Sequence, residues 1–369
     1  MNTDTFIPTF GNRPLRIVGR EKIIDDFTVG LESSIGHPNR ASVLIGQRGT
    51  GKTALLLEFA EIGSARDFIP VRVLAGSDML NDIIETIQAV GQKYIAKAKK
   101  PVKALNASAF GFSFGLTFTE ETEEKYGFRT KLTLLADVLA GYGKGLLFLI
   151  DEIQAMSDEM RVFASTYQHI VGDRKNVAVV MAGLPHAISS VLNDRVLTFL
   201  HRARKIELQP IALSEIRSFY TECFDQLGLT ISRGNLETAV AATCGYPYLL
   251  QLIGYYILKY AGAAGKITGN IVRMAINSSE DDLIDSLHRP CLSPLSKRDI
   301  AFLEAMAEDD GETAISDIVV RLGVSQGTVQ TYRKRLVEAG VIAATRRGYV
   351  DMVVPYMREY LNGTLRTSG

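Results

Sequence analysis

The chain has 369 residues, more than one typical hydrophobic core holds, so we expect two or three domains. Hydrophobic residues make up 46% and charged residues 22%, a balance typical of globular proteins and not of disordered chains. The 41 basic and 41 acidic residues cancel, so any affinity for nucleic acid must come from a local patch. Cys223, Cys244 and Cys291 have no CxxC spacing, which indicates neither a disulfide framework nor a zinc site.

Neither the N-terminus nor the longest apolar stretch predicts a secreted or membrane protein. Residues 1–13 lack the basic segment and apolar run of a secretory signal. Residues 241–260 hold 18 residues before the first charge, but Pro247, Gln251 and Gly254 interrupt them, so we interpret this stretch as a buried helix. We therefore expect a cytoplasmic protein with no membrane partner, which also suits three unpaired cysteines.

Four short aliphatic runs, and a last segment at 205–211 that Pro210 closes, predict the strands of one parallel sheet. Such runs are apolar on both faces, as strands covered by helices on each side are. Amphipathic helical segments separate the runs, and this alternation predicts a doubly wound α/β domain to about residue 209. The predicted strands are 43–46, 68–75, 146–151, 177–183 and 205–211.

An insertion at 108–131 breaks this alternation. Residues 110–118 alternate apolar with small or polar side chains, and this two-residue period predicts a strand with one apolar face. An acidic loop follows it. Two interpretations stay open, a hairpin packed on the sheet edge and a partner-binding surface. The acidic residues are Glu120, Glu121, Glu123 and Glu124.

The second half of the chain changes character. From about residue 212 to 285 the pattern is helical, without strand-like alternation, and predicts a small helical bundle. Pro290 and Pro294 lie close together after it and predict a linker. The predicted domains are therefore 1–209, 210–289 and 290–369.

Residues 46–53, GQRGTGKT, match the phosphate-binding pattern G-x-x-x-x-G-K-[ST]. The glycines let the backbone curl so that successive N–H groups point at phosphate oxygens, and a helix beginning near Lys52 adds its positive dipole end. We expect Lys52 to reach the β- and γ-phosphates and the Thr53 hydroxyl to be a ligand of Mg²⁺. The predicted ligand is ATP or ADP with Mg²⁺, held by Gly46, Gln47, Arg48, Gly49, Thr50, Gly51, Lys52 and Thr53.

An acidic pair ends the third predicted strand. The apolar residues 146–150 deliver Asp151 and Glu152 to the carboxyl end of a buried strand, where ligands of open α/β sheets bind. We expect Asp151 to hold Mg²⁺ through its water shell, and Glu152 to orient and deprotonate the attacking water. The alternative is that these acids only cap the next helix. The first interpretation predicts an ATPase.

The segment IVGREKIIDDF (17–27), the phosphate loop and LLFLIDE (146–152) together resemble the additional-strand P-loop ATPases of the AAA+/STAND group. Within that group the chain is most similar to origin-recognition-like and archaeal-type ATPases, which end in a winged helix. The resemblance implies that the Gly-Arg-Glu box lies beside the adenine. Without the resemblance, the same box would be a helix start with a solvated Arg-Glu pair. The box corresponds to Val18, Gly19, Arg20 and Glu21.

Two later segments extend the resemblance. GYPYLLQ (245–251) resembles the Gly-x-Pro signature of STAND lids, which implies that Pro247 lies over the base, unless the proline only starts a helix. FLHRARKIELQPI (199–211) resembles the segment in which relatives carry an arginine that answers the γ-phosphate. Arg202, with Arg204 as second choice, would stabilise transition-state charge in cis or from a neighbouring subunit. A solvated basic stretch is the alternative.

One position departs from the family pattern. Many AAA+ relatives place a polar sensor residue at the end of the fourth strand, where this chain has Ala182 and Gly183. A pore-loop signature of an unfoldase is not visible either. We therefore expect a slow ATPase switch and not fast, ring-type cycling.

Residues 313–355 resemble a winged helix-turn-helix, with a helix, a tight turn, a second helix and two strands. Gly323 suits the turn, and Ser325 can cap the second helix. Residues 321–347 contain six basic residues and one acidic residue, whereas 299–317 contains acidic residues but no Lys or Arg. A basic segment of this kind favours groove insertion with phosphate contacts. The candidate DNA contacts are Gln326, Thr328, Gln330, Thr331, Arg333, Lys334, Arg346 and Arg347.

Two functions stay open after the sequence analysis. In the first, the protein is a molecular switch that binds and hydrolyses ATP and couples its nucleotide state to DNA binding through the winged helix. In the second, the winged helix is a structural latch or protein-docking module, and the switch acts on a protein partner or by self-association. The predicted fold is the same for both: a P-loop NTPase parallel sheet of the α/β class, a helical lid and a C-terminal winged helix-turn-helix.

Overall fold

The computed structural model describes residues 5–9, 11, 13–97, 112–114, 116–118, 125–154, 156–194, 198–262 and 265–363. Their contacts divide the chain into two units. The sheet unit comprises Arg20–Gly46 and Lys52–Glu207, and the lid unit comprises Met1–Gly19, Gln47–Gly51 and Leu208–Gly369. The tip of the phosphate loop, Gln47–Gly51, thus belongs to the lid unit, whereas Gly46 and Lys52 belong to the sheet unit.

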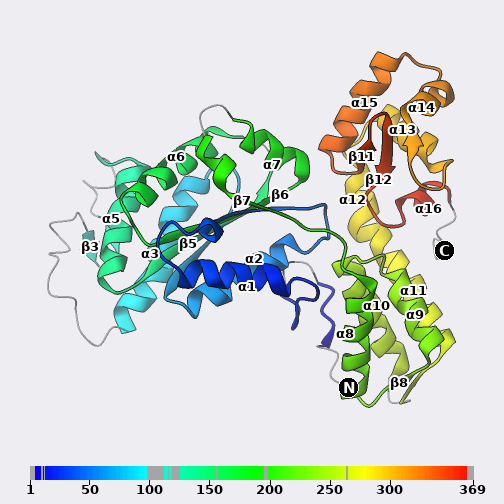
Figure 1. Cartoon of the computed structure of the whole chain (residues 1–369), viewed down its shortest axis with the longest axis horizontal. Helices are drawn as coiled ribbons and strands as arrows, with labels where there is room; N and C mark the ends of the chain where they lie inside the picture. Colours follow the sequence, from blue (N-terminus) through cyan, green and yellow to red (C-terminus); the bar gives the residue numbers. More distant parts are fainter. Residues whose placement is uncertain are drawn as a thin grey trace. The chain divides into compact units, whose positions relative to one another are not determined.

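The sheet unit is built on five parallel strands in the order β2-β5-β6-β1-β7 (Figure 1). The prediction of five parallel strands is confirmed, each within a few residues of its expected bounds. Strand β6 lies between β1, which leads into the phosphate loop, and β5, which carries the acidic pair. The strands are β1 (Ala41–Ile45), β2 (Phe68–Leu74), β5 (Gly145–Ile153), β6 (Val177–Gly183) and β7 (Arg204–Glu207).

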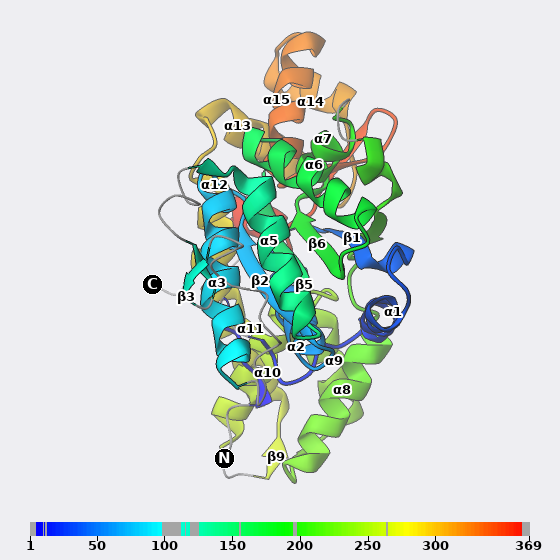
Figure 2. The ribbon, with the colours of Figure 1, turned by 90° about the vertical axis from the view of Figure 1, so that its left-hand side faces the viewer.

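Helices cover both faces of this sheet (Figures 1 and 2). Alternate side chains of β5 point to opposite faces, so Phe148 joins the core beneath one helical layer while Leu147 meets Gly63 on the other. Burial on both faces explains why the strands are continuous aliphatic runs. One layer holds α1 (Glu21–Glu32) and α2 (Lys52–Ser64); the other holds α3 (Met79–Lys97), α5 (Phe128–Gly141), α6 (Asp158–Gly172) and α7 (Pro185–Leu192).

The insertion forms a short hairpin, as predicted, within the described residues. Strands β3 (Phe112–Phe114) and β4 (Thr117–Phe118) pair antiparallel. The buried Leu116 between them lies against Gly91 of α3, and Gln88 of α3 donates a 2.9 Å hydrogen bond to its carbonyl. The hairpin therefore packs on α3, and its buried Leu116 and Phe118 join the hydrophobic core that includes Ile69 of the edge strand β2. Phe110 and the four glutamates of the acidic loop lie outside the described residues.

Four helices form the core of the lid unit, which confirms the helical prediction. The lid unit also contains two strands that the sequence did not predict. Strands β8 and β9, of two residues each, pair in parallel. No helix among the residues described here has both the length and the apolar character needed to cross a membrane. The elements are α8 (Leu213–Gln226), β8 (Thr230–Ile231), α9 (Arg233–Ala242), α10 (Pro247–Ala261), β9 (Lys266–Ile267) and α11 (Gly269–Leu283).

The chain's first residues complete the lid core. Phe6 is 1% exposed and its ring lies over Gly254 of α10, where an added Cβ would collide with it. The ring makes edge contacts with Phe219 and Tyr220 of α8. A hydrogen bond of 2.9 Å from the Ile7 N–H to Oε1 of Gln251 fixes the same segment. The N-terminal segment is therefore part of the lid hydrophobic core.

The predicted linker at 288–294 is wrong, because the chain stays helical there. A π turn over Ile284–His288 extends α11 and leads into α12 (Arg289–Leu292). Pro290 is the second residue of α12 and follows the π turn without a break in the helical run. His288 and Cys291 are buried. The division into domains 1–209, 210–289 and 290–369 remains a prediction.

Residues 295–363 are called the C-terminal module. Its three short strands form an antiparallel sheet in the order β10-β12-β11. Gly323 adopts a left-handed φ of +62° between α14 and α15, and the Ser325 hydroxyl caps α15 by accepting from the Thr328 N–H. The elements are α13 (Lys297–Ala307), β10 (Thr313–Ala314), α14 (Ile315–Leu322), α15 (Gln326–Glu338), β11 (Ile342–Arg346), β12 (Tyr349–Met352) and α16 (Met357–Leu361).

Candidate nucleotide site

The phosphate loop connects β1 to α2, as its sequence predicts. On the sheet-unit side, Lys52 is the first residue of α2 and its Nζ donates a 2.8 Å hydrogen bond to the Gly46 carbonyl. At the loop tip, the Thr50 hydroxyl donates at 2.8 Å to the Gln47 carbonyl. Gly49 and Gly51 have φ of +78° and +88°, values that favour glycine. The glycines are thus required by the backbone of the loop.

The acidic pair occupies an irregular end of β5. The register between β5 and β6 shifts between Ile150 and Ile153, which is the signature of a bulge. Glu152 has a φ of +54°, a conformation that costs a non-glycine residue about 1–3 kcal/mol and that clusters at functional sites. Asp151 is only 8% exposed, whereas Glu152 is exposed. The bulge therefore buries one carboxylate and presents the other.

Thr53 and Asp151 meet at this end of the sheet. The Thr53 hydroxyl donates a 2.7 Å hydrogen bond to Oδ2 of Asp151, and the Glu152 N–H donates at 2.8 Å to Oδ1. A hydroxyl and a carboxylate are the hard oxygen ligands that Mg²⁺ prefers, so these residues fit an ion bound together with substrate phosphates. Among the described residues there is no protein-only cluster of metal ligands.

In the lid unit, the start of α10 packs on the tip of the phosphate loop. An added Cβ on Gly49 would lie 2.8 Å from Cε1 of Tyr246, and one on Gly51 would lie 3.7 Å from Pro247. Pro247 is the first residue of α10, so it does start the helix, as the alternative interpretation states. It also lies beside the loop. Both roles of Pro247 are therefore compatible with its position.

The Val18–Gly19 segment lies in the same unit, next to the start of α8. Gly19 has a φ of +69°, and an added Cβ would come within 2.9 Å of Ile211. The Ile211 N–H donates a 2.8 Å hydrogen bond to the Gly245 carbonyl. The predicted adenine-side residues Val18 and Gly19 are thus gathered with the Gly-x-Pro segment. Arg20 is buried at the start of α1, so the solvated Arg-Glu interpretation is wrong for this residue.

The two candidate arginines have different environments. Arg204, the second choice, donates from its guanidinium to Asp26 at 2.5 Å and to Asn39 at 2.9 Å, and it lowers the pKa of the Asp26 carboxyl by hydrogen bonding. This pairing gives Arg204 a structural role. Arg202, the first choice, is exposed at the end of a 3₁₀ turn (Thr198–Arg202). Arg202 therefore remains the candidate finger.

The end of β6 has no room for a sensor side chain. Ala182 is fully buried, and a Cβ on Gly183 would come within 2.7 Å of the Ile153 carbonyl. The Gly183 carbonyl accepts a 3.3 Å hydrogen bond from the Gly46 N–H, directly before the loop tip. Close backbone approach of the phosphate loop, β5 and β6 explains why small residues stand here.

The candidate DNA contacts of the C-terminal module are mostly at the surface. Half of the basic residues counted in the sequence are, however, paired with the acidic flank. Arg321 binds Asp309 at 2.6 Å, Arg335 binds Asp299 at 2.6 Å and Arg346 binds Glu312 at 2.9 Å. The exposed candidates are Gln326, Gln330, Thr331, Lys334, Arg346 and Arg347, and the half-buried ones are Thr328 and Arg333.

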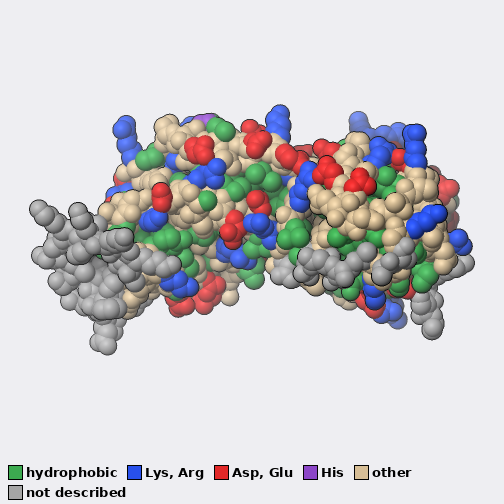
Figure 3. All heavy atoms as spheres, turned by 90° about the horizontal axis from the view of Figure 1, so that it is seen from below, with side chains coloured by type: hydrophobic (Ala, Val, Ile, Leu, Met, Phe, Trp, Pro, Cys, Tyr) green, Lys and Arg blue, Asp and Glu red, His purple; other side chains and the backbone are tan. Residues whose placement is uncertain are grey.

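This pairing reduces the local positive charge that the sequence predicted. Hydrogen bonding from Arg321 and Arg346 holds the pKa of Asp309 and Glu312 below their usual range, so both acids stay charged at neutral pH. Lys and Arg side chains are interspersed with acids on the face shown in Figure 3. The basic and acidic stretches are separate segments of the sequence, and the fold pairs their side chains, so the positive charge at the surface is smaller than a count of residues suggests.

Comparisons with known proteins agree with this architecture. Residues 36–192 match the family model described as "AAA domain", and residues 285–361 match "Domain of unknown function (DUF8462)". The Walker-type ATPase PABY2304 of Pyrococcus abyssi has a TM-score of 0.68 at 17% identity, with 95% of this chain and 97% of that chain covered. The Aeropyrum pernix ORC2 protein in its ADP form has a TM-score of 0.54 at 14% identity, with 97% and 96% covered. None of the curated proteins matches the sequence significantly.

These identities are low enough that the structural likeness concerns the fold alone. The AAA match covers β1, the phosphate loop and the acidic pair, which are the parts that define nucleotide binding in this fold. Residues 36–192 therefore form a P-loop domain of the AAA type. The fold of the chain is similar to that of an archaeal ORC protein, which supports the resemblance stated from the sequence.

Proposed function

We propose that this protein is a molecular switch that binds and hydrolyses ATP and couples its nucleotide state to duplex DNA through the C-terminal module. The observation that carries the proposal is the 2.7 Å contact between Thr53 and Asp151, with Glu152 exposed on the bulge beside it. These residues supply the hydroxyl, the carboxylate and the base that phosphoryl transfer to water requires.

Each site residue has a distinct task in this proposal. The Lys52 ammonium binds the β- and γ-phosphates, and the Gly49 and Gly51 backbone curls around them. Thr53 and Asp151 would hold Mg²⁺, which neutralises charge on the phosphates when it is bound. Glu152 holds the attacking water and accepts its proton. Arg202 contacts the γ-phosphate and stabilises the charge of the transition state. With Ala182 and Gly183 in place of a polar sensor, we expect a slow cycle.

The C-terminal module supports a DNA output by its element order and its exposed polar helix. Helix, strand, helix, helix and a two-stranded hairpin follow one another as in a winged helix. Gln330 and Lys334 lie one turn apart and exposed on α15, and the exposed Arg347 stands at the tip of the β11–β12 hairpin. We propose that α15 enters the major groove and that the hairpin contacts phosphate.

A second candidate is favoured by how the module is fixed to the lid. The Tyr356 hydroxyl donates at 2.7 Å to the Ala242 carbonyl, and Nε2 of His288 lies 2.7 Å from the Pro355 carbonyl. These contacts suit a latch that releases the module to a protein partner or a second copy of the chain. In that case three paired arginines serve the module's own stability and no DNA is bound.

The catalytic half of the proposal is tested by phosphate release from ATP. Glu152→Gln should bind fluorescent ATP with near wild-type affinity and release phosphate at least about 100-fold more slowly, because the general base is lost. Asp158→Asn, which removes an exposed carboxylate at the start of α6, is the matched control and should behave as wild type. Wild-type turnover by Glu152→Gln would contradict the assignment of the base.

A further inference from the structure

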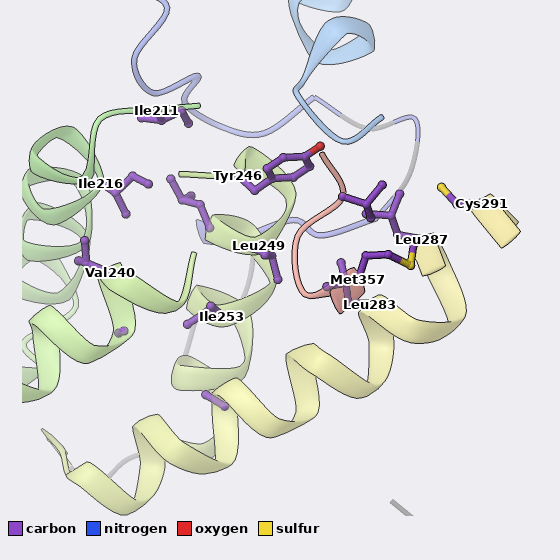
Figure 4. Close-up of a cluster of buried hydrophobic side chains, with 14 of the residues drawn as sticks. Ile211, Ile216, Val240, Tyr246, Leu249, Ile253, Leu283, Leu287, Cys291 and Met357 are labelled. Carbon is purple, nitrogen blue, oxygen red and sulfur yellow. The ribbon is translucent and has the colours of Figure 1, made fainter. Parts of the chain in front are cut away.

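Tyr246 is a buried phenol with no part in the proposed catalytic steps. It immediately precedes Pro247 at the start of α10 and is only 6% exposed. Its ring projects from the start of that helix, with Leu249 and Ile253 following on the same helix (Figure 4). Burial raises the pKa of its hydroxyl well above the usual value, so the phenol keeps its proton. A protonated phenol donates one hydrogen bond.

That proton is directed at the backbone of the phosphate loop. The Tyr246 hydroxyl donates to the Arg48 carbonyl at 2.8 Å, while the ring covers Gly49, where an added Cβ would lie 2.8 Å from Cε1. The carbonyl of Arg48 and the N–H of Gly49 belong to the same peptide group. In a trans peptide they point in opposite directions. The hydrogen bond that holds the Arg48 carbonyl toward Tyr246 therefore directs the Gly49 N–H away from Tyr246.

We propose that Tyr246 is a positioning residue for nucleotide binding, because its hydrogen bond to the Arg48 carbonyl orients the Gly49 N–H as a phosphate donor. The proposal rests on the proposed function, since it assumes that phosphates occupy the loop. Donation to a carbonyl also polarises its peptide group and makes the N–H a stronger donor. Tyr246 thus acts on the phosphates through the backbone and not by touching them.

The same hydroxyl also lies near the C-terminal module. The Val353 carbonyl is 3.4 Å from it, compared with 2.8 Å for the Arg48 carbonyl. Val353 directly follows β12, and its N–H donates at 3.0 Å to the Val341 carbonyl before β11. One proton serves two acceptors, so stronger donation to the loop means weaker donation to Val353. The geometry therefore makes Tyr246 the link between phosphate binding and the module.

Tyr246→Phe tests this link because it keeps the ring on Gly49 and removes only the hydroxyl. We expect the affinity for fluorescent ATP to fall about five-fold, the effect of one hydrogen bond. In steady-state turnover KM should rise while kcat stays near wild type, since the interaction is made in the ground state and the transition state alike. Hydrogen exchange of the β11–β12 amides should respond to ATP in the wild type and not in the variant.

Tyr356→Phe is the matched control. It removes the hydrogen bond of 2.7 Å to the Ala242 carbonyl, which fixes the same segment to α9 without touching the loop. Exchange of the β11–β12 amides should then rise with and without ATP, and ATP affinity should stay at the wild-type value. If Tyr246→Phe behaves like Tyr356→Phe, or like wild type, the proposal is overturned. If wild type itself does not bind ATP, or Lys52→Ala binds equally well, the proposed function fails as well.

Discussion

The hydroxyl of Thr53 donates to the carboxylate of Asp151 across 2.7 Å, and this bond joins the first turn of α2 to the bulged end of β5. The two residues are 98 positions apart in the chain. Strand β6 separates β5 from β1, the strand that precedes the phosphate loop and α2, so the contact depends on the carboxyl ends of parallel strands meeting at one edge. The pairing brings the two sequence motifs together at that edge.

Replacing the loop lysine should remove nucleotide binding. Lys52→Ala removes the ammonium that we propose binds the β- and γ-phosphates, together with its 2.8 Å hydrogen bond to the Gly46 carbonyl. We expect affinity for fluorescent ATP to fall about 100-fold or more, as for charge-assisted hydrogen bonds. Lys93→Ala, at an exposed position of α3, is the control. Binding by Lys52→Ala at wild-type affinity would rule out this loop as the nucleotide site.

The two arginines of the hairpin tip should contribute unequally to DNA binding. Arg346 is paired with Glu312, and its guanidinium lies 3.3 Å from the centre of the Tyr349 ring, whereas Arg347 is exposed. Arg347→Ala should flatten the dependence of log affinity on log salt by about 1, the value for one phosphate contact, and Arg346→Ala by less. In the double variant the slope of log affinity against log salt should flatten by about 1 to 2. An unchanged affinity in the double variant would remove the hairpin from the DNA footprint.

Acidification should lower the free energy of unfolding because His288 is buried. The His288 ring is completely buried between the π turn and Pro355, near Tyr360 and Glu359. Burial lowers the pKa of the imidazole, and this effect outweighs the Pro355 carbonyl and Glu359, which raise it. The unfolded chain therefore binds this proton at a higher pH, near 6.5. Stability is unaffected above that value and falls as the pH drops below it.

Urea unfolding at several pH values measures this effect. Between about pH 7 and about pH 5.5, His288 should cost up to about 1.4 kcal/mol of stability per pH unit. His288→Gln, which retains a donor for the Pro355 carbonyl and does not titrate, should lose less over the same range. Equal losses in the two proteins would show that other groups dominate the pH dependence.

Truncating Phe6 should destabilise the lid unit although this residue lies at the start of the chain. Phe6 is 1% exposed over Gly254 and against Phe219. Phe6→Ala leaves a cavity and should lower the free energy of unfolding by about 3–5 kcal/mol. Leu15→Ala, at a side chain that is 66% exposed, should have little effect in the same urea titration. A wild-type midpoint for Phe6→Ala would show that the segment does not stabilise the lid.

The sheet and the site motifs could be predicted because local chemistry determines them. Continuous aliphatic runs such as 146–150 form buried parallel strands with few alternatives. The phosphate loop needs glycine at Gly49 and Gly51 for its positive φ, so its pattern is visible in the chain. The acidic pair after 146–150 predicted a site at the strand end, and the structure brings Asp151 to Thr53 there.

Other features depend on tertiary contacts that leave no periodic pattern. Strands β8 and β9 have two residues each, too few to show alternation. Pro290 suggested a linker, yet it lies within a continuous helical run from α11 through α12. The pairing of Arg335 with Asp299 joins residues 36 positions apart, which a count of charges does not reveal. The role of Tyr246 likewise depends on its contact with Arg48, 198 positions away.

Steady-state ATP turnover with and without duplex DNA, at low and moderate salt and alongside Glu152→Gln, tests the proposed switch most directly. We expect DNA to raise turnover, added salt to remove the increase as phosphate contacts weaken, and Glu152→Gln to abolish turnover in every condition. Slow turnover that is indifferent to DNA at both salt concentrations would contradict the DNA-coupled switch. It would leave the latch, acting on a protein partner, as the function of the C-terminal module.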